Sequence, residues 1–167
     1  HAASLQELAE LTASQLKAQG VSSVALGYDA SLFAGPGWNP NWPEYFGTSV
    51  ANITALTADH GRANLTSWVR SPDPAKLAAD GFAAQLAAQG VTVSGVSAAT
   101  TPADAAQVAA GASLPVGVIV ERVLGDSDND AAETMLWHVA LARGQQATPA
   151  DGAAVLTAEL QRLRLWS

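Results

Sequence analysis

Hydrophobic positions along the chain follow a helical repeat in some segments and a strand-like alternation in others. Leucine residues recur at helical spacing over residues 4–19, which predicts a helix, and Gly20 supplies its C-terminal stop. Apolar and polar residues then alternate over residues 21–28, which predicts a strand. The same order returns as a predicted helix over residues 74–89, a stop at Gly90 and a valine-rich strand. Two such helix–strand units predict a mixed α/β arrangement for the first part of the chain.

The segment between these two units is rich in aromatic residues and turn formers. Residues 29–47 contain three prolines and three glycines among tryptophan, tyrosine and phenylalanine side chains, which predicts a long loop. These aromatic side chains could anchor the loop to the core or stack on a sugar ring. Residues 50–58 and 65–69 read as extended segments around a turn at residues 59–62, and we expect them to pair as a hairpin.

Helical repeats dominate the last part of the chain. Apolar spacing predicts helices over residues 114–124, 129–143 and 150–163. We therefore expect an α/β (α+β) fold class, with an α/β domain over residues 1–113 and a helical part over residues 114–167.

The charge balance narrows the classes of partner. The net charge is −7, so nucleic-acid phosphates and anionic membrane surfaces would be repelled. No run of about 18 apolar residues is present, so we expect no membrane span. Cysteine is absent, which excludes disulfides and thiol chemistry. The histidines lack metal-ligand spacing, and the acidic residues over 126–133 lack the glycine and the final glutamate of a calcium loop, so we expect no metal and no cofactor.

One triplet, Ser127-Asp128-Asn129, stands at the start of the helix predicted over residues 129–143. It places a hydroxyl and a carboxamide side by side on a short turn. The same residues also suit a helix N-cap, because Ser and Asp side chains accept hydrogen bonds from the first N–H groups of a helix. Both interpretations stay open on these three residues alone.

The surroundings of this triplet resemble a known family. Residues 120–133 (Val-Glu-Arg-Val-Leu-Gly-Asp-Ser-Asp-Asn-Asp-Ala-Ala-Glu) and residues 138–142 (His-Val-Ala-Leu-Ala) resemble the D-alanyl-D-alanine carboxypeptidase/endopeptidase family, the class C penicillin-binding proteins. Residues 27–33 resemble the family's strand followed by Asp-x-Ser-x-Phe, and residues 53–62 resemble its Ala-Leu-x-x-Asp-x-Gly-Arg turn. The resemblance covers nearly the whole chain. It implies an accessory α/β domain followed by part of the helical subdomain of a transpeptidase/β-lactamase-like fold.

The resemblance also implies a reaction. In that family a serine nucleophile attacks the carbonyl between two D-Ala residues of a peptidoglycan stem peptide, and water then resolves the acyl-enzyme. β-Lactams acylate such enzymes. Ser127 would relay a proton toward the leaving amine, Asn129 would hydrogen-bond the substrate's amide backbone, and Asp128 would point away and help to cap the helix. Such an enzyme is expected outside the cytoplasmic membrane, whether secreted, periplasmic or associated with the cell wall.

This sequence departs from the family pattern in two of the three active-site elements. Neither of its lysines, Lys17 and Lys76, is followed by Thr-Gly, so the family's Lys-Thr-Gly strand is expected beyond Ser167. Ser14 and Lys17 form a literal Ser-x-x-Lys, but they lie late in an amphipathic helix. The family's nucleophile instead starts a buried helix, where free N–H groups help to form the oxyanion site. We therefore expect the chain to be a middle portion of such a protein.

Three functional hypotheses follow. We expect the isolated chain to be inactive, and to expose apolar surface that associates with a complementary fragment or with a second copy. A second hypothesis is a non-catalytic module that binds the cell wall or a partner. A third is a self-sufficient serine hydrolase that uses Ser14 and Lys17, which labelling of Ser14 by a β-lactam would establish.

Overall fold

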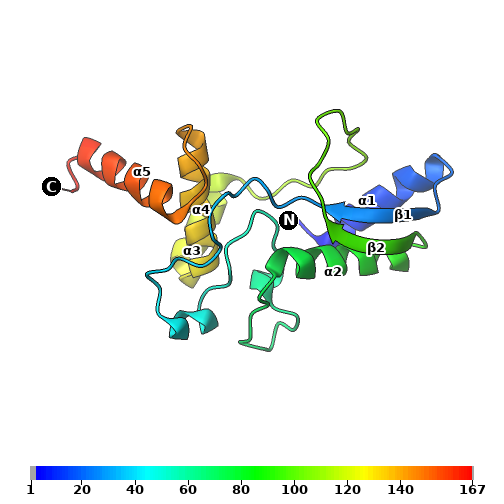
Figure 1. Ribbon diagram of the computed structural model, residues 1–167, viewed down its shortest axis with the longest axis horizontal. Helices are drawn as coiled ribbons and strands as arrows, with labels where there is room; N and C mark the ends of the chain where they lie inside the picture. The colour runs from blue at the N-terminus through cyan, green and yellow to red at the C-terminus, as the bar shows by residue number, and fades with distance from the viewer. Residues whose placement is uncertain (1–2, 167) are drawn as a thin grey trace.

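The computed structural model describes residues 3–166, which form two lobes along one long axis (Figure 1). One lobe holds α1 (Leu5–Ala18), β1 (Ser23–Tyr28), α2 (Pro74–Ala88) and β2 (Thr92–Ala98). The other lobe holds α3 (Val116–Asp126), α4 (Asn129–Ala142) and α5 (Pro149–Arg162). Two short 3-10 helices, η1 (Glu44–Thr48) and η2 (Asp59–Gly61), lie in the connection between β1 and α2. The mixed α/β class predicted from the sequence is confirmed. None of the helices in the described range has the length and apolar character needed to cross a membrane.

Local capping signals explain where the helices of the α/β lobe begin and end. At the start of α1, the Ser4 hydroxyl accepts a hydrogen bond from Glu7 N at 3.0 Å. Both α1 and α2 are followed by a glycine with left-handed backbone, Gly20 at φ 74° and Gly90 at φ 78°. The valine after each glycine donates its N–H to a carbonyl five positions back and so closes the helix end. The two predicted glycine stops are therefore confirmed.

The strands β1 and β2 pair in parallel, and α2 belongs to the connection between them. Residues of β1 alternate between exposed and half-buried, so only one face of this small sheet is covered. A cluster of Ala9, Ala13, Leu86 and Val91 fills the space between the two helices and that face. The small alanine side chains let α1 and α2 lie close together, which explains how an alanine-rich sequence builds a dense core.

A carboxylate links the segments that follow the two strands. Asp29, directly after β1, accepts hydrogen bonds from Ser31 N at 2.9 Å and from Thr101 N at 2.7 Å, beyond β2. The Ser31 hydroxyl and the backbone N–H groups of Thr101 and Ser31 hold the pKa of Asp29 well below its usual range. The charged form of Asp29 therefore stabilises this lobe.

We expect Asp29→Asn to destabilise the chain at neutral pH, with a deficit that narrows in acid. The folded-state pKa lies below the unfolded one, so the stabilisation is present above the unfolded-state pKa and is lost as the pH falls through the folded-state pKa. The difference between the urea midpoints of variant and wild type should therefore become smaller from about pH 7 down to about pH 2. Asp104→Asn, at an exposed carboxylate, serves as the control. A deficit of constant size across this range would contradict the assignment.

The long loop after β1 packs on the helical lobe. Phe33, Val50 and Ile53 surround Trp137 of α4, which is fully buried, and Ala147 completes this cluster. Further aromatic side chains of the loop pack against it: Trp38, Trp42 and Phe46. Anchoring, one of the two roles predicted for the loop aromatics, is therefore confirmed for these residues. The cluster joins residues from both sides of position 113, and a domain boundary there stays a prediction.

The hairpin predicted over residues 50–69 is wrong, because the structure contains no strand in this range. The N–H groups that a strand ladder would use have other partners. Ala51 N donates to a carboxylate on α4 at 2.7 Å, and Ile53 N donates to a carbonyl of the aromatic loop at 2.8 Å. Further along, the Asn64 side chain accepts from the backbone two residues ahead and holds a local turn. The apolar residues at the start of this segment therefore pack around a helix and do not pair with a second strand.

Candidate functional site

The Ser127 triplet lies at a sharp junction between two helices. α3 ends where Ser127 adopts left-handed backbone (φ 56°, ψ 45°), and Asp128 N donates to the Val123 carbonyl at 3.1 Å. The Asp128 side chain accepts a hydrogen bond from Ala131 N at 3.0 Å and so caps α4. Asp128 therefore supplies the N-cap, while Ser127 and Asn129 on either side of it are exposed.

Ser127 and Asn129 line one hollow of about 450 Å³. The same hollow is also lined by Arg62 and Trp68, and the Arg62 guanidinium lies over the Trp68 ring, 5.2 Å from its centroid. Asn129 also lines a second, more apolar hollow of about 660 Å³. The walls of the second hollow include Trp42, Tyr45, Phe46, Met135, Val139 and Leu156. Asn129 thus stands between a polar hollow and an apolar one.

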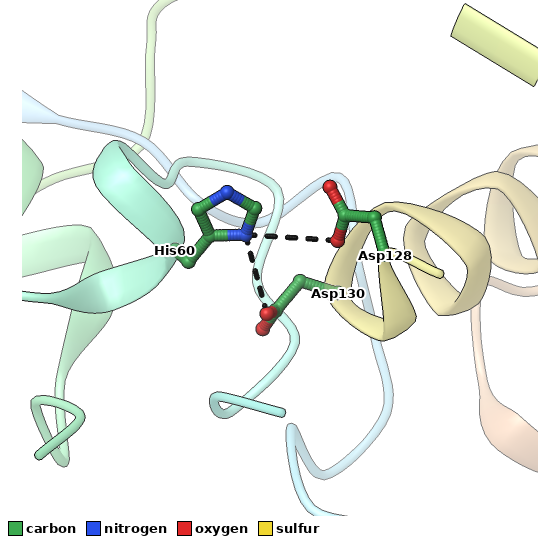
Figure 2. Close-up of side chains that lie close together, drawn as sticks. All are labelled: His60, Asp128 and Asp130. Atoms are coloured by element: carbon green, nitrogen blue, oxygen red, sulfur yellow. Dashed lines mark hydrogen bonds and ion pairs between the residues drawn. The ribbon is translucent and has the colours of Figure 1, made fainter. Parts of the chain in front are cut away.

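His60 faces two carboxylates at the edge of the polar hollow (Figure 2). Its Nδ1 lies 3.3 Å from Asp130 Oδ2 and 3.6 Å from Asp128 Oδ1. These two aspartates flank Asn129 at the N-terminal end of α4, where the positive end of the helix dipole favours carboxylates. The structure therefore gathers three ionisable side chains around the exposed carboxamide.

Arg70 approaches Asp130 as well. Its Nη2 lies 3.2 Å from Asp130 Oδ2, and its Nη1 donates to the His60 carbonyl at 2.5 Å. The other carboxylate oxygen of Asp130 accepts from Ala51 N at 2.7 Å. Only 7% of the Arg70 side chain and 13% of the Asp130 side chain are exposed, so their attraction is weakly screened. We call Asp130, Arg70, His60 and Ala51 N–H together the Asp130 clamp.

The same cluster offers ligands that a metal ion could use. Ligand atoms of His60, Asp128 and Asp130 lie within 4.8 Å of one another. However, Arg70 already places a positive charge at Asp130, and the Asp128 oxygen nearest His60 accepts the cap hydrogen bond of α4. Both features weaken cation binding, because a cation would face like charge and compete for an occupied oxygen. The arrangement favours an ion-pair clamp over a metal centre.

The sequence-predicted residues fall in different lobes (Figure 1). The structure brings Ser127 and Asn129 to one hollow, which is lined by the α3–α4 junction and by the connection that precedes α2. Ser14 and Lys17 are instead exposed on α1 in the α/β lobe. The roles predicted for all four residues stay predictions. Sequence analysis missed Arg70, because no local motif marks an arginine whose partner lies far along the chain.

Comparisons with known proteins place the chain in a family. Residues 62–165, which include the whole α3–α4 junction, match the family model of the D-Ala-D-Ala carboxypeptidase 3 (S13) family. Carboxypeptidase Rv3627c of Mycobacterium tuberculosis is 32% identical over 130 residues, covering 77% of this chain and 28% of that protein. Carboxypeptidase DacB of Mycolicibacterium smegmatis is 30% identical over 165 residues, covering 93% of this chain and 34% of that protein.

The matches cover most of this chain but only a small part of each relative. The chain spans about a third of the length of these curated relatives. No solved structure matches it significantly. The family match nevertheless covers more than half of the chain and contains the complete Ser-x-Asn triplet. The chain therefore belongs to the D-Ala-D-Ala carboxypeptidase 3 (S13) family.

Proposed function

We propose that this chain supplies the Ser-x-Asn part of a serine-type DD-carboxypeptidase/endopeptidase that acts on peptidoglycan stem peptides and is acylated by β-lactams. The observation that carries the proposal is the α3–α4 junction. There Ser127 and Asn129 line one hollow, while Asp128 between them is engaged in the helix cap. A hydroxyl and a carboxamide fixed on one short turn can contact the same substrate. Because their positions are already set, little conformational entropy is lost when the substrate binds. The family match supports this class of reaction.

In the proposed reaction the nucleophilic serine and the catalytic lysines come from other segments of the enzyme. The serine oxygen attacks the carbonyl of the penultimate D-Ala, the C–N bond breaks, and the terminal D-Ala leaves with the serine's proton on its nitrogen. Water then adds to the ester carbonyl, and the released serine recovers a proton. Ser127 relays the proton to the leaving nitrogen, and the Asn129 carboxamide both donates to and accepts from the substrate backbone.

We also propose where the protein acts and which surface it uses to assemble. The peptidoglycan substrate lies outside the cytoplasmic membrane, and we place the protein there. α3 has no buried residue, and its exposed apolar side chains include Val116, Val118, Val120 and Leu124. Apolar surface of this kind next to the Ser-x-Asn turn supports docking of a complementary part of the enzyme or of a second copy.

Ser127→Ala and Asn129→Ala are each expected to slow acylation by a fluorescent penicillin about 100-fold, because each removes a transition-state contact while the nucleophile is retained. The second-order rate is measured on the intact gene product that carries this sequence. Ser113→Ala, at an exposed serine ahead of α3, should label at the wild-type rate. Wild-type rates for both site variants would remove the roles proposed here.

Intact-mass measurement on the chain alone tests the hypothesis of a self-sufficient hydrolase. After incubation with penicillin we expect no adduct, because the proposal assigns the nucleophile to another segment. An adduct that maps to Ser14, and is lost in Ser14→Ala, would instead establish a self-sufficient hydrolase.

The apolar hollow favours a second candidate, a module that binds cell-wall material without turnover. Tyr45 in its wall is 73% exposed, and Trp42 lies beside it in the same wall, so both rings could stack on a ligand. Retention of the chain on insoluble peptidoglycan, reduced in Tyr45→Ala and without release of D-Ala, would favour this candidate.

A further inference from the structure

We infer that Asp130 is a positioning residue, which fixes Asn129 through the Asp130 clamp. The inference rests on the proposed function and adds a residue to it that the Ser-x-Asn motif does not contain. Asp130 is the next residue after Asn129 and belongs to the first turn of α4. Its position therefore sets the position of the carboxamide.

Both carboxylate oxygens of Asp130 are engaged by groups from other parts of the chain. Oδ1 accepts from Ala51 N at 2.7 Å, and Oδ2 lies 3.2 Å from Arg70 Nη2 and 3.3 Å from His60 Nδ1. Charge-assisted contacts of this kind are stronger and more directional than neutral ones. Three segments of the long connection thus hold one side chain of α4.

Two of the three groups that hold Asp130 are largely buried, whereas the His60 side chain is 43% exposed. Ala51 is 3% exposed, and its neighbours Val50 and Ile53 belong to the cluster around Trp137. The Arg70 side chain is mostly buried, and its second donor is bound to the His60 carbonyl. Through Ala51 and Arg70, the clamp therefore ties the first turn of α4 to buried parts of the chain.

The helix that precedes the Ser-x-Asn turn, α3, is not held by comparable buried contacts. α3 contributes no buried residue to the lobe, so packing of α3 does little to fix Ser127. The position of Asn129 then depends on α4, and at the start of α4 it depends on Asp130. Displacement of a substrate-positioning group by about 1 Å can slow a reaction about 100-fold.

The test is a double-variant cycle on acylation of the intact gene product by a fluorescent penicillin. Asp130→Ala is expected to slow acylation at least tenfold, and Asp130→Asn, which keeps an acceptor for Ala51 N, is expected to recover part of this loss. The decisive variant combines Asn129→Ala with Asp130→Ala. If Asp130 acts through Asn129, the double variant is no slower than Asn129→Ala alone, whereas independent effects would multiply.

The matched control is Asp80→Ala, which removes a carboxylate from an exposed ion pair with Lys76 in the α/β lobe and should label at the wild-type rate. Wild-type labelling by Asp130→Ala, or multiplied losses in the double variant, would overturn the inference. If Asp130→Ala fails to fold, Asp130→Asn takes its place in the cycle, with the same expectation of no further loss beside Asn129→Ala. If Asn129→Ala itself labels at the wild-type rate, the role proposed for Asn129 is wrong, and the positioning role that depends on it is wrong as well. A slow Asn129→Ala beside a normal Asp130→Ala removes only the positioning role.

Discussion

A Trp137→Ala variant is expected to lose about 3–5 kcal/mol of unfolding free energy, the range typical of a buried tryptophan. Trp137 is 0% exposed, its ring lies 5.1 Å from that of Phe33 between centroids, and its Nε1 donates to Glu133 at 3.0 Å. Removal of the indole would leave a cavity where the aromatic loop meets α4. For a chain of this size such a loss corresponds to a fall in Tm of about 10 °C.

Thermal unfolding followed by circular dichroism measures this loss. Trp166→Ala is the matched control, because Trp166 is 60% exposed and its removal should change stability by no more than about 0.5 kcal/mol. A loss below about 1 kcal/mol for Trp137→Ala would mean that the loop and α4 do not share a core. Because Asn129 and Trp137 lie on the same helix, the variant should also loosen the candidate site.

Features encoded by neighbouring residues could be predicted from the sequence. The ends of α1 and α2 follow from Gly20 and Gly90, because only the two or three residues around each glycine decide the cap. The strand β1 follows from the alternation over residues 21–28, and the Ser127 triplet is recognisable because its three residues are contiguous. In each case the determining contacts lie within one turn or one strand.

Features that depend on distant partners could not be predicted in this way. Val50 and Ile53 are apolar because they pack around Trp137 of α4, and the sequence alone suggested a hairpin that does not form. No sequence spacing predicts the pairing of Arg70 with Asp130, because the pair joins an irregular loop to the start of a distant helix. The triplet could therefore be found from the sequence, but the groups that hold it in place could not.

The second large effect is expected from Arg70→Met, which should lose about 3 kcal/mol of unfolding free energy. The mostly buried Asp130 carboxylate would keep its charge without the Arg70 guanidinium. Arg143→Met, which breaks a more exposed ion pair with Glu159, should lose less than about 1 kcal/mol. Urea unfolding of both variants at neutral pH gives the comparison. Equal losses would show that the Asp130 clamp is no more than a surface contact.

Combining Arg70→Met with Asp130→Asn identifies the source of that loss. The single variant loses stability chiefly through an uncompensated charge, so removal of that charge should recover at least half of the lost free energy even though no ion pair is restored. The asparagine oxygen also keeps an acceptor for Ala51 N, which the clamp needs at its other end. A double variant as unstable as Arg70→Met would instead locate the loss in Arg70's packing and in its hydrogen bond to the His60 carbonyl. In that case stability would come from the loop itself, and the charge of Asp130 would serve mainly to place Asn129.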